Sequence, residues 1–257
     1  MKQRWMGTSW KMNKTLAEAR HYAQALGQAL AEDPALTAGV RPFIIPSHTA
    51  IAAVAETLGD LTRAPDGVLI GAQNAHWEPA GAWTGEISVP QAADAGAQMI
   101  EIGHSERREH FNETIETTRL KVAATLNHGL IPLLCIGEPT AVRRAGNSTT
   151  YILEQAAGAL DSLSESELSR VLIAYEPIWA IGEQGRPARP EELVETFDAL
   201  QVRYGGRTAG ILYGGSVNLE NASDLLSIHT IDGLFIGRAA WDVTGYLKLL
   251  ALAASTD

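Results

Sequence analysis

A glutamate at the end of an apolar run is the residue of this chain that most directly suggests chemistry. Glu176 follows residues 171–175, which read as a buried strand, and α/β folds place their reactive groups at such strand ends. Pro177 ends the strand because proline has no N–H to donate. The apolar segment that follows is interrupted by glycine and proline, which predicts a lid that covers a base and excludes water. The alternative is a solvated glutamate on a surface loop.

His104 is the second candidate, because it follows another apolar run at residues 99–102 and precedes a helical turn at 105–108. Gly103 between them lets the backbone turn or approach a neighbour closely. A helix dipole disfavours the cationic form of a histidine at its N-terminus, so we expect His104 to be neutral and to donate a hydrogen bond to a carbonyl. The other six histidines lack such a setting, and we expect structural or surface roles for them.

Lys11 follows the first apolar run and could hold an anion or stabilise an oxyanion. Its alternative is a solvated lysine, which is how we interpret Lys14. Glycine-rich turns at 214–216 and at Gly237 follow two later runs, where exposed N–H groups can bind phosphate. A base, a neutral histidine, a lysine, two such turns and a lid fit proton abstraction beside the carbonyl of a phosphorylated substrate, through an enediolate.

The elements that would position these residues alternate along the chain. Short apolar runs predict eight strands, at residues 5–9, 42–45, 68–72, 99–102, 131–136, 171–175, 210–213 and 233–236. Amphipathic segments predict eight helices, at residues 16–31, 49–58, 90–95, 116–127, 151–160, 191–204, 222–227 and 246–254. Such alternation implies parallel strands with right-handed crossovers. Eight repeats favour a (β/α)8 barrel, an α/β fold, over an open sheet.

Local signals agree with these boundaries. Ser88 and Gln91 resemble a capping box with a proline in the first turn, and residues 127–129 form a helix stop that ends on glycine. The Arg/Gly/Ser/Thr-rich stretch 143–150 predicts a surface connection. No stretch has the composition of an interdomain linker, so we expect a single domain over residues 1–257.

Composition limits the possible partners. The formal net charge is −10, which argues against nucleic acid and anionic membrane surfaces as partners. No apolar run approaches the roughly 20 residues of a membrane span, and no signal peptide is recognisable. The lone Cys135 fits a reducing compartment, so we expect a cytoplasmic protein. No metal-ligand pattern occurs, and we expect no metal and no cofactor.

The motifs resemble those of the triosephosphate isomerase family, whose fold is the TIM barrel. They are WKMN at 10–13, GAQN at 71–74, GAWTGE at 81–86, GHSERR at 103–108, CIGE at 135–138, AYEPIWAIG at 174–182, YGGSV at 213–217 and DGLFIG at 232–237. The resemblance spans the whole chain in order. It implies Glu176 as the base, His104 as the electrophile and Lys11 as the electrostatic anchor, roles for which this family is itself a standard example.

The resemblance also implies how substrate and subunits are held. The residues that would hold the phosphate are Gly182, Ser216, Gly237 and the backbone N–H of Arg238. Glu106 would support the site. Thr84 lies in the loop that, in the family, inserts into a partner subunit, so a homodimer is implied.

Three departures from the family pattern bear on the substrate. Ser9 stands where asparagine is usual, Arg238 replaces a second glycine, and the far end of the lid at 183–188 is one residue longer. Ser9 leaves space and a hydroxyl beside the reacting carbons. With its flanking pattern at 7–15, Trp83 and the run 237–241, it makes the chain similar to the four-carbon branch of the family. That branch converts L-erythrulose 1-phosphate to D-erythrulose 4-phosphate in erythritol catabolism.

Two alternative functions are also compatible with the sequence. One is a true triosephosphate isomerase, which interconverts dihydroxyacetone phosphate and D-glyceraldehyde 3-phosphate, with Ser9 tolerated. The other is a barrel that binds a sugar phosphate without catalysis, since a fold alone does not fix function.

Overall fold

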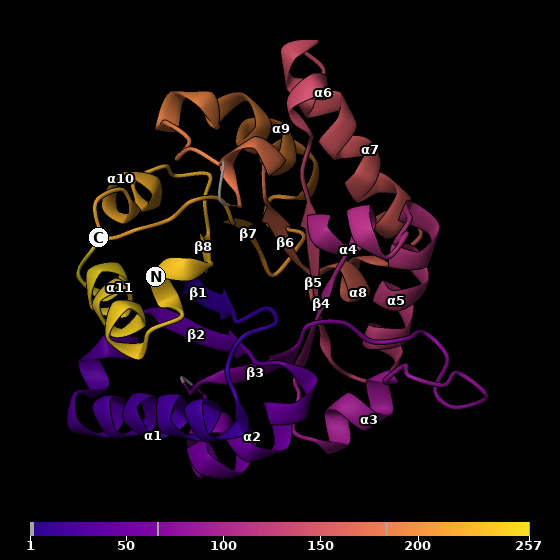
Figure 1. Ribbon diagram of the computed structural model, residues 1–257. Helices are drawn as coiled ribbons and strands as arrows, with labels where there is room; N and C mark the ends of the chain where they lie inside the picture. The colour runs from indigo at the N-terminus through magenta and orange to yellow at the C-terminus, as the bar shows by residue number, and fades with distance from the viewer. Residues whose placement is uncertain (1–2, 66, 183–184, 257) are drawn as a thin grey trace.

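Eight parallel strands close into a barrel in the order β1 to β8 (Figure 1). The computed structural model describes residues 3–65, 67–182 and 185–256. The strands are β1 Arg4–Ser9, β2 Val40–Ile45, β3 Leu69–Ala72, β4 Met99–Ile102, β5 Ile131–Ile136, β6 Leu172–Tyr175, β7 Gly210–Tyr213 and β8 Gly233–Ile236. The predicted (β/α)8 fold is confirmed, and strand ends differ from the prediction by at most two residues.

Helices surround the barrel on its outside (Figure 1). They are α1 Leu16–Glu32, α2 Ile51–Leu58, α3 Val89–Asp94, α4 Ser105–His110, α5 Ile115–Asn127, α6 Thr140–Arg144, α7 Ser148–Leu160, α8 Glu165–Leu168, α9 Val194–Tyr204, α10 Ala222–Leu226 and α11 Val243–Ser255. Short 3₁₀ turns are η1 Pro34–Thr37, η2 His48–Ala50, η3 Gly59–Thr62, η4 Ile178–Ala180, η5 Pro190–Glu192 and η6 Arg238–Ala240. The helix predicted over 191–204 therefore begins as a 3₁₀ turn, and α9 starts at Val194.

The surface connection predicted at 143–150 is present but shorter, with residues 144–147 exposed. Residues 143–144 end α6 and residues 148–150 begin α7, so that only 145–147 lie outside a helix. The Arg143 guanidinium packs 3.6 Å from the centroid of the Trp179 ring and pairs with Glu192 at 2.6 Å. Composition alone suggested a loose segment, but these distant partners hold the end of α6 in place.

Two predicted helix boundaries are confirmed by their caps. Ser88 and Gln91 form the reciprocal hydrogen bonds of a capping box at the start of α3. Helix α5 ends at Asn127, and Gly129 beyond it has a φ of 82°, a left-handed conformation that favours glycine. Within the described ranges, no helix has both the length and the apolar character that a membrane crossing requires.

The barrel has an inner core that is separate from the layer between strands and helices. The inner side chains are Phe43, Ile45, Leu69, Met99, Leu133, Cys135, Leu172, Ala174, Leu212 and Phe235. Because side chains alternate along a strand, Glu101 faces the same interior as Met99, whereas Ile100 and Ile102 pack in the outer layer. A carboxyl group therefore points into an apolar barrel.

Candidate active site

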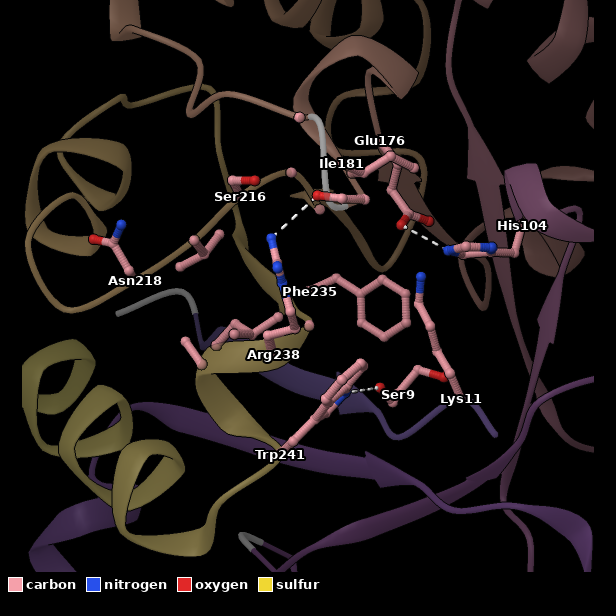
Figure 2. A pocket seen from close by; sticks show the side chains of 18 of the residues that line it. Ser9, Lys11, His104, Glu176, Ile181, Ser216, Asn218, Phe235, Arg238 and Trp241 are labelled. Carbon is pink, nitrogen blue, oxygen red and sulfur yellow. Dashed lines mark hydrogen bonds and ion pairs between the residues drawn. The ribbon is translucent and has the colours of Figure 1, made fainter. Parts of the chain in front are cut away.

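A pocket of about 730 Å³ opens at the C-terminal ends of the strands. Nine of the predicted site residues line it and can be followed in part in Figure 2. They are Ser9, Lys11, His104, Glu106, Glu176, Gly182, Ser216, Gly237 and Arg238. The strand ends therefore bring together groups that are up to 229 positions apart in the sequence. Thr84 is the exception and lies elsewhere.

Glu176 and His104 face each other across the pocket. Oε2 of Glu176 lies 3.3 Å from Nε2 of His104, and the two residues are only 5% and 4% exposed. Glu176 directly follows β6 and His104 directly precedes α4, so the barrel sets both positions. Within the described part of the chain, Oε1 of Glu176 is buried without a hydrogen-bond partner. The pair therefore combines a carboxylate oxygen that is available to accept a proton with an imidazole N–H that can donate a hydrogen bond.

The hydrogen bonds of His104 define its tautomer. The backbone N–H of Glu106 donates to Nδ1 at 3.2 Å, so the ring proton belongs on Nε2, which faces Glu176. Burial lowers the pKa of His104, but the Glu176 and Glu101 carboxylates together outweigh burial and raise it to about 8. Protonation of Nδ1 would set its N–H against the backbone N–H of Glu106, so the contact at Nδ1 favours the neutral imidazole. It supports the neutral ring that the helix position predicts.

Glycines that directly follow the two neighbouring strands, β5 and β7, make room for Glu176. A Cβ on Gly214 would lie 2.5 Å from Cγ of Glu176, and a Cβ on Gly137 would overlap the carbonyl oxygen of Glu176. The glycine turn after β7 was predicted for its N–H groups. Gly214 is also required for steric reasons, because any larger residue there would displace the Glu176 carboxylate.

Lys11 is held in an unusual backbone conformation. Its φ is 54°, in the left-handed region that is costly for a residue with a side chain. Gln73 Nε2 donates to the Lys11 carbonyl at 2.8 Å, and Lys11 Nζ lies 2.5 Å from Oε1 of Glu106. Burial alone would raise the pKa of Glu106, but the hydrogen bond from Lys11 lowers it. The ammonium group is thereby directed into the pocket.

Lys14 is not the solvated lysine that the sequence suggested. Its Nζ donates to the carbonyl of Trp241 at 2.5 Å and lies 5.3 Å and 5.1 Å from the ring centroids of Trp10 and Tyr22. Burial lowers its pKa. Lys14 therefore ties the loop after β1 to the loop after β8, a role that depends on partners far away in the sequence.

The predicted phosphate residues gather at one end of the pocket. Ser216 Oγ donates to the carbonyl of Ala180 at 2.7 Å, and Arg238 Nη2 donates to the carbonyl of Gly182 at 3.1 Å. Both bonds join the loops after β7 and β8 to the lid, residues 177–188. The sequence suggested only the backbone N–H of Arg238, but Figure 2 shows its guanidinium reaching into the pocket as well.

Side chains outside the pocket hold the base of the lid. Trp179 Nε1 donates to Oε1 of Glu138 at 2.7 Å, and Tyr175 donates to the same oxygen at 3.2 Å. At the other end, the Arg186 guanidinium makes two bonds to Glu192, of 2.7 Å and 2.6 Å, and these lower the pKa of Glu192. Of the altered far end, residues 183–184 lie outside the described ranges.

Glu101 is the site residue that the sequence reasoning missed. Ser9 Oγ donates to its Oε2 at 2.8 Å, and Glu101 is only 3% exposed. Burial raises its pKa to about 7; His104 opposes this shift and Glu176 adds to it. The available signal was an acidic residue in the inward register of an otherwise apolar strand.

Thr84 lies away from the pocket, on an exposed loop between β3 and α3. The loop projects from the barrel (Figure 1), and a bridge between His76 and Ser88 closes its neck. The His76 ring stacks 4.1 Å from Trp77 and lies 4.3 Å from Trp83. Among the residues that the structure describes, no three His, Cys, Asp or Glu side chains group as a metal site would require.

Comparisons with known proteins identify the family that this chain resembles over nearly its whole length. The family model described as Triosephosphate isomerase matches residues 4–253. An L-erythrulose-1-phosphate isomerase from Mycolicibacterium smegmatis is 64% identical over 253 residues, which are 98% of this chain and 94% of that protein. One from Rhizobium rhizogenes is 50% identical, with 98% and 95% covered. A crystal structure of triosephosphate isomerase from Bartonella henselae has a TM-score of 0.82 at 28% identity, with 97% and 98% covered.

Proposed function

The chain belongs to the triosephosphate isomerase family, and from this premise we propose that it converts L-erythrulose 1-phosphate to D-erythrulose 4-phosphate. The observation that carries this substrate is the near full-length match to relatives named L-erythrulose-1-phosphate isomerase. Ser9 supports it, because a small side chain beside the reaction centre leaves room for a fourth carbon.

Glu176 and His104 would carry out the proton transfers. The Glu176 carboxylate takes the proton from C3 of the ketose while Nε2–H of His104 donates to the C2 carbonyl oxygen. The resulting enediolate spans C2 and C3. The protonated Glu176 returns its proton to C2, and His104 gives a proton to the C2 oxygen and takes one from the C3 hydroxyl, which leaves the carbonyl on C3 and gives the 4-phosphate. Each step is assigned to side chains of the protein.

The remaining pocket residues would bind the substrate. The ammonium of Lys11 would stabilise negative charge on the enediolate oxygen. The phosphate would lie between Gly182, Ser216, Gly237 and Arg238, where backbone N–H groups and a guanidinium favour an anion. Closure of the lid over this end would exclude water, which protects the enediolate from side reactions.

The second candidate is the three-carbon reaction, interconversion of dihydroxyacetone phosphate and D-glyceraldehyde 3-phosphate. The likeness to the solved triosephosphate isomerase supports it, since the same base, histidine and phosphate site would serve both substrates. Ser9 distinguishes the two candidates.

Steady-state kinetics of the purified protein on both ketose phosphates will test the assignment. We expect kcat/KM to be much larger for L-erythrulose 1-phosphate, and a large preference for the triose would overturn the proposal. Ser9→Asn should reduce four-carbon turnover by crowding while it preserves or raises triose turnover.

The proposal extends to assembly and location. We infer a cytoplasmic homodimer whose subunits are each one barrel domain over residues 1–257. The exposed loop that carries Thr84 supports the dimer, because its Trp83 side chain is 48% exposed and offers a partner an apolar surface. Sedimentation of the full chain at micromolar concentration should give twice the monomer mass of 27.5 kDa.

A further inference from the structure

A carboxyl group that the proposed reaction does not use lies beneath the pocket. Glu101 is on β4, three residues before His104, and its inward neighbours are apolar side chains such as Met99 and Cys135. Burying a carboxyl group is unfavourable unless hydrogen bonds compensate for the lost water. Glu176, His104 and Lys11 are the charged groups that act on it. A buried carboxyl group this close to the reaction centre can influence how the substrate is bound.

Ser9 connects this carboxyl group to the pocket. Its hydroxyl donates to Oε2 of Glu101 at 2.8 Å, and Ser9 also lines the pocket. A serine hydroxyl has one proton and two lone pairs. With its proton directed to an ionised Glu101, the hydroxyl offers the pocket only lone pairs. Ser9 can then accept a hydrogen bond from a substrate but cannot donate one.

The position of Ser9 determines which part of a substrate it would meet. Figure 2 shows Ser9 beside Lys11, on the opposite side of the pocket from Ser216 and Asn218. The indole N–H of Trp241 donates to the Ser9 carbonyl at 2.9 Å and fixes its backbone. A sugar phosphate with its phosphate near Ser216 and its reacting carbons near Glu176 would extend its far end toward Ser9.

We propose that Glu101 is a positioning residue that holds the Ser9 hydroxyl as an acceptor for the terminal hydroxymethyl O–H of a four-carbon ketose phosphate. The inference rests on the proposed function and explains its specificity. The three-carbon ketose has a hydrogen in place of the hydroxymethyl group, so it leaves the Ser9 acceptor without a partner. A site built around a substrate hydroxyl disfavours the analogue that lacks it.

Glu101→Gln tests this assignment with little change in size. The amide can donate to Ser9 Oγ and so turn the serine proton toward the pocket, where it would face the substrate O–H. Kinetics at pH 8, above the pKa of about 7 for Glu101, should be measured on L-erythrulose 1-phosphate and dihydroxyacetone phosphate. We expect the ratio of kcat/KM, four-carbon over three-carbon, to fall by about tenfold.

A double-mutant cycle shows whether Glu101 acts through Ser9. Ser9→Ala should lower the same ratio, and adding Glu101→Gln to Ser9→Ala should lower it no further. Asp232→Asn is the matched control, because Asp232 is also a buried carboxyl group and accepts from the Ile211 N–H at 2.8 Å. It precedes β8, at the opposite end of the barrel, so its loss should leave the ratio unchanged.

The outcomes separate this inference from the proposed function. A wild-type protein without a four-carbon preference would overturn both. A preference that survives Glu101→Gln, or effects of the two substitutions that simply add, would overturn the inference alone. If Glu101→Gln fails to fold, Ser9→Ala decides, because an unchanged ratio in that variant would also rule the inference out.

Discussion

The floor and the rim of the pocket are built in different ways. We call Ser9, Glu101, His104 and Glu176 the floor, and Gly182, Ser216 and Arg238 the rim. The floor groups are buried, and the strands of the barrel set their positions. The rim groups follow the strands, and Ser216 and Arg238 each donate one hydrogen bond to a carbonyl of the lid. Changes to the floor should therefore alter kcat or specificity, whereas changes to the rim should alter KM.

The largest effect should come from the base on the floor. Glu176→Gln keeps the shape of the side chain but removes its capacity to accept a proton. We expect kcat to fall by roughly 10²–10⁴-fold, with KM changed much less. Loss of exchange of the C3 hydrogen with deuterated solvent would show that proton abstraction itself has failed. Unchanged turnover would refute the role of Glu176 as base.

The next effect concerns how the stability of the floor depends on pH. The pKa of Glu101 rises from its ordinary 4.5 to about 7 through burial, so the native state holds this proton over a range where the unfolded chain has lost it. The stability that this proton supplies is present below pH 4.5 and is lost as the pH rises through 7. The loss amounts to about 3 kcal/mol.

Glu101→Gln removes this titration and gives the matched comparison. Urea unfolding of both proteins at pH 5 and pH 8 should show the wild type losing more free energy of unfolding than the variant. Groups that titrate in both, such as His104, largely cancel in the difference. Parallel pH profiles would contradict the raised pKa of Glu101.

A third change tests how tightly the floor is packed. Gly214→Ala places a methyl group 2.5 Å from Cγ of Glu176, and the resulting shift of the base should cost about 10²-fold in kcat. Gly27→Ala is the control. Gly27 lies within α1, and the added methyl group would meet Leu61 at an ordinary contact distance of 3.5 Å. That variant should keep full activity and gain about 0.5–1 kcal/mol of stability. Full activity in both would mean that the base tolerates displacement.

The smallest effect should come from the rim. Arg238→Ala removes a guanidinium that can pair with phosphate, and we expect KM to rise about tenfold while kcat changes little. Arg207→Ala is the control, since Arg207 is an exposed arginine paired with Glu165 outside the pocket. A fall in kcat rather than a rise in KM would place Arg238 with the floor in function.

The sequence predicted what depends on neighbours along the chain. Strand ends, the barrel and the positions of Glu176 and His104 follow from local runs and from the rule that such ends converge. Glu101 and Arg143 were missed, and Lys14 was misjudged, because the hydrogen-bond partners of all three lie far away in the sequence. Ser9 bonds to a residue 92 positions along the chain. A local sequence pattern cannot predict such a long-range contact.

The lone thiol of the chain also takes its character from the barrel. Cys135 lies in the inner core and is buried, and burial raises its pKa, so little thiolate forms in the native state. Alkylating reagents react with thiolate. Labelling of this sulfur would therefore require the barrel to open. The rate of alkylation of Cys135 should therefore report how often the barrel opens, so the native thiol can be used to follow unfolding without an added probe.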